Sequence, residues 1–156
     1  MSLAIVDKNT YWKQLEQTIK ALNKTVIKVG IQKDAGKNEN GQYIADYGAA
    51  NEFGVITAKN KIPARSFLRS TTDENNGWKK EIDQAYTDIL EGKSTPINAM
   101  SKVGIKARDD IVTKINKGDP SWLPNAGSTI KRKKSSRPLI DTGFLKKAIQ
   151  YQFEVK

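Results

Sequence analysis

The C-terminal segment Gln150–Val155 constrains the fold most, because apolar and polar residues alternate strictly from Ile149 onwards. A period of two with one apolar face is typical of an antiparallel strand that helices cover on one side only. Thr25–Gln32 carries the same signal, with Ile27, Val29 and Ile31 on one face. We therefore expect an α+β fold in which these two strands pair in a small antiparallel sheet.

Three longer segments repeat their apolar residues at helical spacing, and we expect helices at 8–23, 78–90 and 97–117. The first has an apolar stripe, which we call the N-terminal stripe, made of Trp12, Leu15, Ile19 and Leu22. We expect Trp12 to anchor this helix in the core, as large aromatic residues commonly do. Thr71–Gly77 is polar and predicts a kink or loop before the second helix.

Composition favours one domain, residues 1–156, and excludes several classes of chemistry. The chain has no cysteine and no histidine, so it lacks thiolate chemistry, the commonest general base and the commonest metal ligand. Asp34 and Glu39 match no ion-binding loop, and we expect neither a metal nor another cofactor. No apolar run suits a membrane span, and residues 1–10 do not read as a signal peptide, so synthesis in the cytoplasm is expected.

The carboxylates are poorly placed for catalysis, and we expect no enzyme. Asp46 and Glu52 lie six residues apart and would point to different faces of a helix. The adjacent Asp109 and Asp110 diverge for the same reason, and Ser66 has no histidine to activate it.

The central stretch Tyr43–Thr71 is the most distinctive part of the sequence. We expect a short helix at 44–53 that Gly54 ends, then a projecting loop over 51–61 that includes Lys59 and Asn60, then a helix with Pro63 in its first turn. Phe53, Phe67 and Leu68 are predicted to be buried. Arg65 and Arg69 would share one helix face and meet a carboxylate, either Glu52 or one on a neighbouring subunit.

Residues 118–138, which we call the arm segment, contain three prolines and two glycines and predict an irregular, projecting arm. Trp122 and Leu123 lie between two of the prolines, and Trp122 either packs back onto the domain or anchors a partner. The basic cluster consists of Lys131, Arg132, Lys133, Lys134 and Arg137. It contributes to a net charge of +10 that is concentrated in the last third of the chain. After the arm segment, Asp141 or Thr142 is expected to cap a helical turn from Gly143 to Lys147.

Three ordered motifs resemble a known family. They are Val29-Gly30-Ile31, then Asn-Glu-Phe-Gly (51–54) with Ile-Pro-Ala-Arg-Ser-Phe-Leu-Arg (62–69), then Pro-Leu-Ile-Asp-Thr-Gly-Phe-Leu (138–145) followed by Ile149. Together they resemble the tail-component and virion-morphogenesis proteins of tailed bacteriophages and prophages, over roughly residues 26–155. Each motif is short, and the specificity lies in their order.

The resemblance implies a structural part of the virion: a neck, tail-completion or head–tail joining protein that works as a ring of identical subunits. Its partners would be other copies of itself and connector, portal-side or tail-tube and terminator proteins, with packaged DNA passing through the channel and no membrane contact. The arm segment, with Trp122 burying in a neighbouring subunit, would then be an assembly element. An alternative from the residues alone is a basic nucleic-acid-binding protein that acts through the basic cluster.

Overall fold

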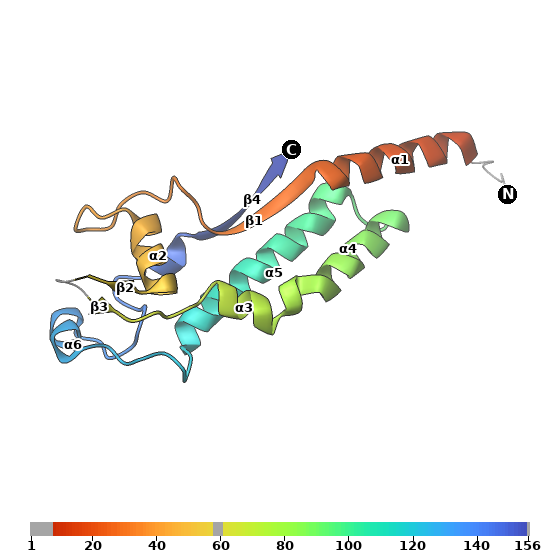
Figure 1. Cartoon of the computed structure of the whole chain (residues 1–156). Coiled ribbons are helices and arrows are strands. Elements are labelled where there is room, and N and C mark those ends of the chain that lie inside the picture. The colour runs from red at the N-terminus through yellow and green to blue at the C-terminus, as the bar shows by residue number, and fades with distance from the viewer. Residues whose placement is uncertain (1–7, 58–60, 156) are drawn as a thin grey trace.

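The structure is a computed structural model that describes residues 8–57 and 61–155 (Figure 1). Lys59 and Asn60 of the predicted loop lie outside the described residues. Residues 1–7, most of the segment judged for a signal peptide, lie outside them as well. The elements in order are α1 (Lys8–Lys24), β1 (Thr25–Ile31), α2 (Ile44–Phe53), β2 (Val55–Ile56), β3 (Lys61–Ile62), α3 (Arg69–Glu74), the 3-10 turn η1 (Asn76–Trp78), α4 (Lys79–Leu90), α5 (Pro96–Lys117), α6 (Gly127–Lys133), α7 (Phe144–Lys147) and β4 (Ile149–Val155). The α+β fold class is confirmed.

The predicted pairing of the two strands is confirmed. β1 and β4 form an antiparallel ribbon in which Thr25 lies opposite Val155 and Ile31 opposite Ile149. Its outer face is polar, and the Lys28 amine lies 2.6 Å from the Glu154 carboxylate there. Its inner face packs on α5 so closely that a Cβ added to Gly104 would lie 2.5 Å from a ring carbon of Tyr151. The strand therefore rests against a glycine, which lets the helix and ribbon approach.

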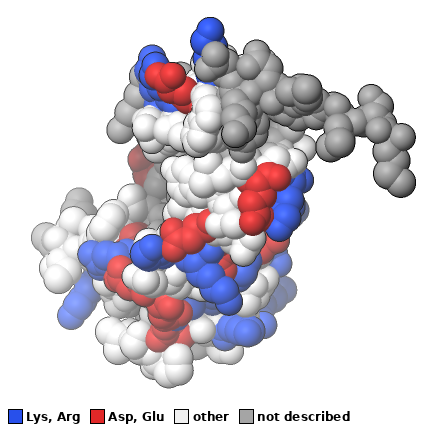
Figure 2. All heavy atoms as spheres, turned by 90° about the vertical axis from the view of Figure 1, so that its right-hand side faces the viewer, with Lys and Arg blue, Asp and Glu red and all other residues white. Residues whose placement is uncertain are grey.

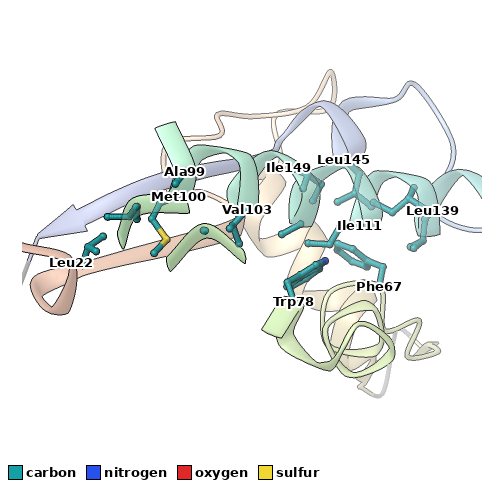
Figure 3. Close-up of a cluster of buried hydrophobic side chains, with 14 of the residues drawn as sticks. Leu22, Phe67, Trp78, Ala99, Met100, Val103, Ile111, Leu139, Leu145 and Ile149 are labelled. Carbon is teal, nitrogen blue, oxygen red and sulfur yellow. The ribbon is translucent and has the colours of Figure 1, made fainter. Parts of the chain in front are cut away.

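Helix α5 is the centre of the molecule. Pro96 occupies its first turn, and the Thr95 hydroxyl accepts a hydrogen bond from the Asn98 amide at 3.3 Å. Along the helix one face is buried from end to end: Ala99, Met100, Val103, Gly104, Ala107, Ile111 and Ile115. Figure 3 shows the core as a row of side chains along this helix, from Leu22 at one end to Leu139 at the other. Helix α4 packs beside α5, and the ribbon covers another side.

The kink expected within 71–77 is present at the end of that segment, but the prediction is wrong for residues 71–74, which belong to helix α3. Gly77 and Trp78 both have positive φ, which separates α3 from α4. Trp78 is buried, and its indole N–H donates to the Asp110 carboxylate on α5 at 2.9 Å. A positive φ is unfavourable for a tryptophan, and burial of the ring together with this hydrogen bond holds the conformation.

Helix α1 continues the line of β1 away from the rest of the molecule (Figure 1). The prediction that Trp12 anchors it in the core is wrong, because 62% of Trp12 is exposed. Among the α1 side chains whose burial the structure describes, Leu22 in the last turn is the one that belongs to the core cluster. Among the described residues, no helix is long and apolar enough to cross a membrane.

Candidate partner-binding surfaces

The carboxylate of Glu52 organises the central stretch, in a group we call the Glu52 cluster. It accepts a hydrogen bond from the Ser66 hydroxyl at 2.6 Å. It also accepts hydrogen bonds from the backbone amides of Phe67, Leu68 and Arg69 at 2.7, 2.9 and 3.0 Å. These amides open α3, where no partner exists within the helix itself. A side chain from α2 thus caps a helix that starts 17 residues later.

Burial and hydrogen bonding act on Glu52 in opposite directions. Only 3% of the residue is exposed, and this burial by itself raises the pKa of its carboxyl. The hydrogen bonds from Leu68, Ser66, Arg69 and Phe67 stabilise the charged form and outweigh burial, so the pKa is lowered overall. Glu52 is therefore a structural anion in the interior.

Arg65 ties the same stretch to the arm segment. Its guanidinium donates to the carbonyl oxygens of Leu123 at 3.0 Å and Pro124 at 3.1 Å, and its own amide donates to Asn51 O at 2.7 Å. The prediction that Arg65 and Arg69 share a helix face is wrong, because Arg65 precedes α3 in a segment without regular secondary structure and is buried. The first predicted partner, the Glu52 carboxylate, is wrong for both guanidinium groups, since Glu52 accepts the Ser66 hydroxyl and three backbone amides. The second, a carboxylate on a neighbouring subunit, stays a prediction for Arg69.

The expected helix opening at Pro63 is also wrong, because α3 begins only at Arg69. Residues 61–62 instead pair with 55–56 in a small hairpin that replaces part of the loop predicted at 51–61. Gly54 enters this hairpin with a φ of 75°, and a Cβ there would lie 2.9 Å from Ala64 N. The predicted need for glycine at the end of α2 is thereby confirmed, for reasons of close approach as well as conformation.

Of the three apolar residues predicted to be buried here, Phe67 is fully buried and Leu68 is partly buried. The prediction is wrong for Phe53, of which 68% is exposed. Phe53 falls on the outer face of α2, and the Arg69 guanidinium lies over its ring, 5.9 Å from the centroid. Ile56 in the adjoining hairpin is 84% exposed.

The arm segment is anchored at Trp122. This residue is 8% exposed, belongs to the core cluster, and its indole N–H donates to Ser66 O at 3.2 Å. The first alternative, packing back onto the domain, therefore holds, and the prediction that Trp122 lies outside the core and buries in a neighbour is wrong. Leu123, next to it, is 62% exposed. The two neighbours thus differ sharply in exposure.

The basic cluster lies on α6 and the turn after it. Lys131, Arg132 and Lys134 are exposed, and Lys133 is partly buried. The Arg137 guanidinium donates to Asn116 O, and the buried Asn125 side chain donates to the carbonyls of Ser136 and Arg137. The Arg137 bond holds the end of the cluster against α5, and the Asn125 bonds join the two ends of the loop to each other.

A groove of about 880 Å³ opens between α2, the loop that precedes it, α6 and the segment before α7; we call it the basic groove. Its charged lining residues are Lys61, Arg65, Arg132 and Lys133 against Glu39 and Asp141. Burial lowers the pKa of the Lys133 amine, although the charge of Asp141 opposes this shift. Arg65 and Arg132 repel the protonated amine and lower the pKa further. The groove is thus suited to an anionic group that would relieve this repulsion.

The prediction that Asp141 or Thr142 caps the last helical turn is wrong. Gly143 itself takes the N-terminal position of α7, with a φ of 84°, and neither Asp141 nor Thr142 makes a side-chain cap. Asp141 and Thr142 line the basic groove instead.

The role of Glu52 was missed by the sequence reasoning, although the sequence contained a signal. Ile44, Gly48, Asn51 and Glu52 fall on one face of α2, and all four are buried. A carboxylate on the inward face of a short helix has to be paired or hydrogen-bonded. Its donors lie in a segment whose distance in sequence gives no hint of the contact.

Comparisons with protein-family models, curated proteins and solved structures gave no match to this chain. Within residues 8–57 and 61–155, no three acidic, histidine or cysteine side chains gather as a metal site would require. The opposite signs of charge are interspersed on the face shown in Figure 2. Because the comparisons gave no match, the family resemblance remains a prediction.

Proposed function

We propose that this protein is a structural component of a tailed phage or prophage, a neck, tail-completion or head–tail joining protein that assembles as a ring. The observation that carries the proposal is the set of ordered motifs, whose residues have architectural roles in the fold. Glu52 caps α3, Gly54 permits the hairpin, Arg65 holds the arm segment and Phe67 fills the core. The proposal assigns no catalytic activity to the chain.

Exposed apolar residues beside the basic groove support a role in assembly. Phe53, Ile56 and Leu123 are 68%, 84% and 62% exposed, and they lie on the elements that surround the Glu52 cluster. Neck and tail proteins have to bind other proteins on more than one side, which requires such surfaces. The basic groove would receive an acidic side chain or segment of a neighbouring virion protein.

Deletion of the coding gene from the phage or prophage that carries it tests the proposal. DNA-filled heads and separate tails should accumulate, and the wild-type gene supplied in trans should restore joined particles. The protein should also be found in purified virions at the head–tail junction by immunogold labelling. Joined, infectious particles without the gene would contradict the proposal.

A second candidate function, binding of nucleic acid, is favoured by one observation: three lysine and arginine side chains of the basic cluster are exposed together on α6 and the residue after it. Binding of this kind would fall steeply with added salt, since each neutralised phosphate releases counterions. Fluorescence anisotropy with duplex DNA separates the candidates. Tight binding that the double variant Lys131→Ala, Lys134→Ala abolishes would favour nucleic acid. The joining role predicts that this variant still enters particles, because neither lysine lines the basic groove.

A further inference from the structure

Helix α1 presents the N-terminal stripe, which its own chain leaves largely uncovered. Trp12 and Ile19 are 62% and 42% exposed, Leu15 is half-buried, and only Leu22 is buried. The stripe from Trp12 to Leu22 runs about 15 Å, at 1.5 Å per residue. In proteins a helix of this length draws most of its stability from packing of its apolar face. The stripe is therefore suited to a complementary surface.

The same molecule carries such a surface, an apolar groove of about 390 Å³. One wall is β1 with Ile27 and Val29, the other is α4 with Ile82 and Tyr86, and α5 forms the floor. Tyr86 is 39% exposed at the rim. A volume of this size takes a few side chains rather than a whole helix, which matches the exposed part of the N-terminal stripe.

Leu22 connects the two surfaces, since it is the last residue of the stripe and also lines the apolar groove. Nevertheless, the stripe of one chain does not fill the groove of the same chain. α1 continues the direction of β1 away from the body (Figure 1), so its exposed residues lead away from the groove. The groove and the stripe are thus available to two different copies.

Charge adds a second, independent match. The sequence of α1 contains four lysines and one glutamate, a net charge of +3. Helix α4 (79–90) contains three acidic residues and two lysines, a net charge of −1, and Lys79 pairs with Asp83 at 2.8 Å. The helix that carries the stripe and the helix beside the groove are therefore opposite in the sign of their net charge, in addition to the match of their apolar surfaces. Two copies of α1 would instead bring like charges together.

We propose that α1 of one copy docks its stripe into the apolar groove of a second copy. Ile19 and Trp12 enter between β1 and α4, and the lysines of α1 lie near the acidic side of α4. Because helix and groove are different surfaces, each copy offers one of each, and the contact can repeat from copy to copy. This inference rests on the proposed function and deepens it, because it names the surfaces through which a ring of identical subunits would form.

Site-directed cross-linking tests the contact directly, because the chain has no native cysteine. Full-length Ile19→Cys protein and a larger, tagged Tyr86→Cys protein are mixed and treated with a short bis-maleimide. The expected main product joins one copy of each, at a mass that identifies it. Gln17→Cys replaces Ile19→Cys in the control, since Gln17 is exposed on the opposite face of α1, and it should give little product.

Sedimentation of two charge variants provides the quantitative arm. Ile19→Glu should raise the Kd of self-association roughly tenfold or more, the effect of a lost anchor at the centre of an interface. Gln17→Glu introduces the same charge on the other face and should change it little. The circular dichroism of both variants should match that of the wild type, because both sites are exposed.

The outcomes separate this inference from the proposed function. If the protein self-associates but the cross-link joins two copies of the Ile19→Cys protein, or Gln17→Cys reacts as well as Ile19→Cys, the docking is wrong while a ring with other contacts survives. A protein that stays monomeric at every concentration tested, in the free form and in particles, overturns both. The product that joins Ile19→Cys to Tyr86→Cys, together with the loss of association in Ile19→Glu, supports the docking.

Discussion

The two ends of this molecule differ in what they bury. At the end that holds α2 and the arm segment, polar side chains lie inside: Asn51, Glu52, Arg65 and Asn125 are all buried. Every buried side-chain nitrogen and oxygen in the described part of the chain has a hydrogen-bond partner. At the other end, α1 holds apolar side chains outside, with Trp12 and Ile19 largely uncovered.

The difference separates the two tasks that we assign to the ends. A buried polar network is costly when one member is lost and stabilising when all members are present, so it fixes one arrangement of α2, α3 and the arm segment within a single copy. An exposed apolar stripe contributes little to the stability of a single copy. Its burial against a second copy removes apolar surface from water and so favours association. The first end should govern stability, and the second should govern association.

The largest effect is expected at the first end, from Phe67→Ala. Phe67 is fully buried beside the Glu52 cluster, and truncation of a core phenylalanine costs about 3–5 kcal/mol of unfolding free energy. Phe53→Ala is the matched control, because Phe53 is 68% exposed on the neighbouring helix. Urea unfolding curves of the two variants should differ clearly in midpoint. Equal midpoints would show that the core does not lie where the structure puts it.

Trp122→Ala should cost about 3 kcal/mol, at the lower end of the range for a buried aromatic residue, since Trp122 lies at the edge of the core. Trp122→Phe keeps most of the ring but removes the donor to Ser66 O, and should cost about 1 kcal/mol. Thermal unfolding of the isolated subunit measures both. An unchanged midpoint in Trp122→Ala would restore the view that this residue waits for a partner.

The sequence predicted the elements whose signal is local, and it failed where the contact is distant. The alternation at 149–155 and the helical spacing at 97–117 both depend on neighbours in sequence, and the structure has a strand and a helix there as predicted. The predictions that Phe53 is buried and that Trp122 lies outside the core were wrong, because both were based only on the residues nearby in the sequence. Ser66, which receives Trp122, lies 56 residues away.

Pro63 and Arg65 show a second limit. A proline followed by apolar residues is typical of a helix start, yet α3 begins six residues later because the Glu52 carboxylate supplies its cap there. Without knowledge of that long-range acceptor, the local signal points to the wrong residue. The same holds for Arg65, whose partners are backbone carbonyls that carry no signature in sequence.

Glu52→Gln should cost about 2 kcal/mol, because it replaces a charged acceptor of four hydrogen bonds by an amide whose NH₂ group faces donors. Asp46→Asn is the control, an exposed carboxylate on the same helix. Its effect should stay within about 0.5 kcal/mol. If the Glu52→Gln protein were as stable as the control, the Glu52 cluster would not contribute to stability as predicted.

The pH dependence of the unfolding free energy gives a second test of the role of Glu52. The folded-state pKa of Glu52 lies below the unfolded value of about 4.3, so the unfolded state binds the proton more readily. The stabilisation is fully present above that unfolded value and is lost as the pH falls through the lower folded value. The unfolding free energies of the wild type and of Glu52→Gln, measured from neutral to acid pH, should therefore converge as the pH falls.

The smallest effect on stability is expected at the second end, from Trp12→Ala. The substitution is the same as at Trp122, but Trp12 is 62% exposed, so in dilute protein the unfolding free energy should change by about 0.5 kcal/mol or less. At concentrations where the wild type associates, the same variant should become clearly less stable than the wild type, because association stabilises only the folded state. Thermal unfolding over a range of protein concentrations measures both. A large loss in dilute protein would place Trp12 in the core of the single copy, and the contrast between the two ends would fail at the residue where the sequence alone had expected an anchor.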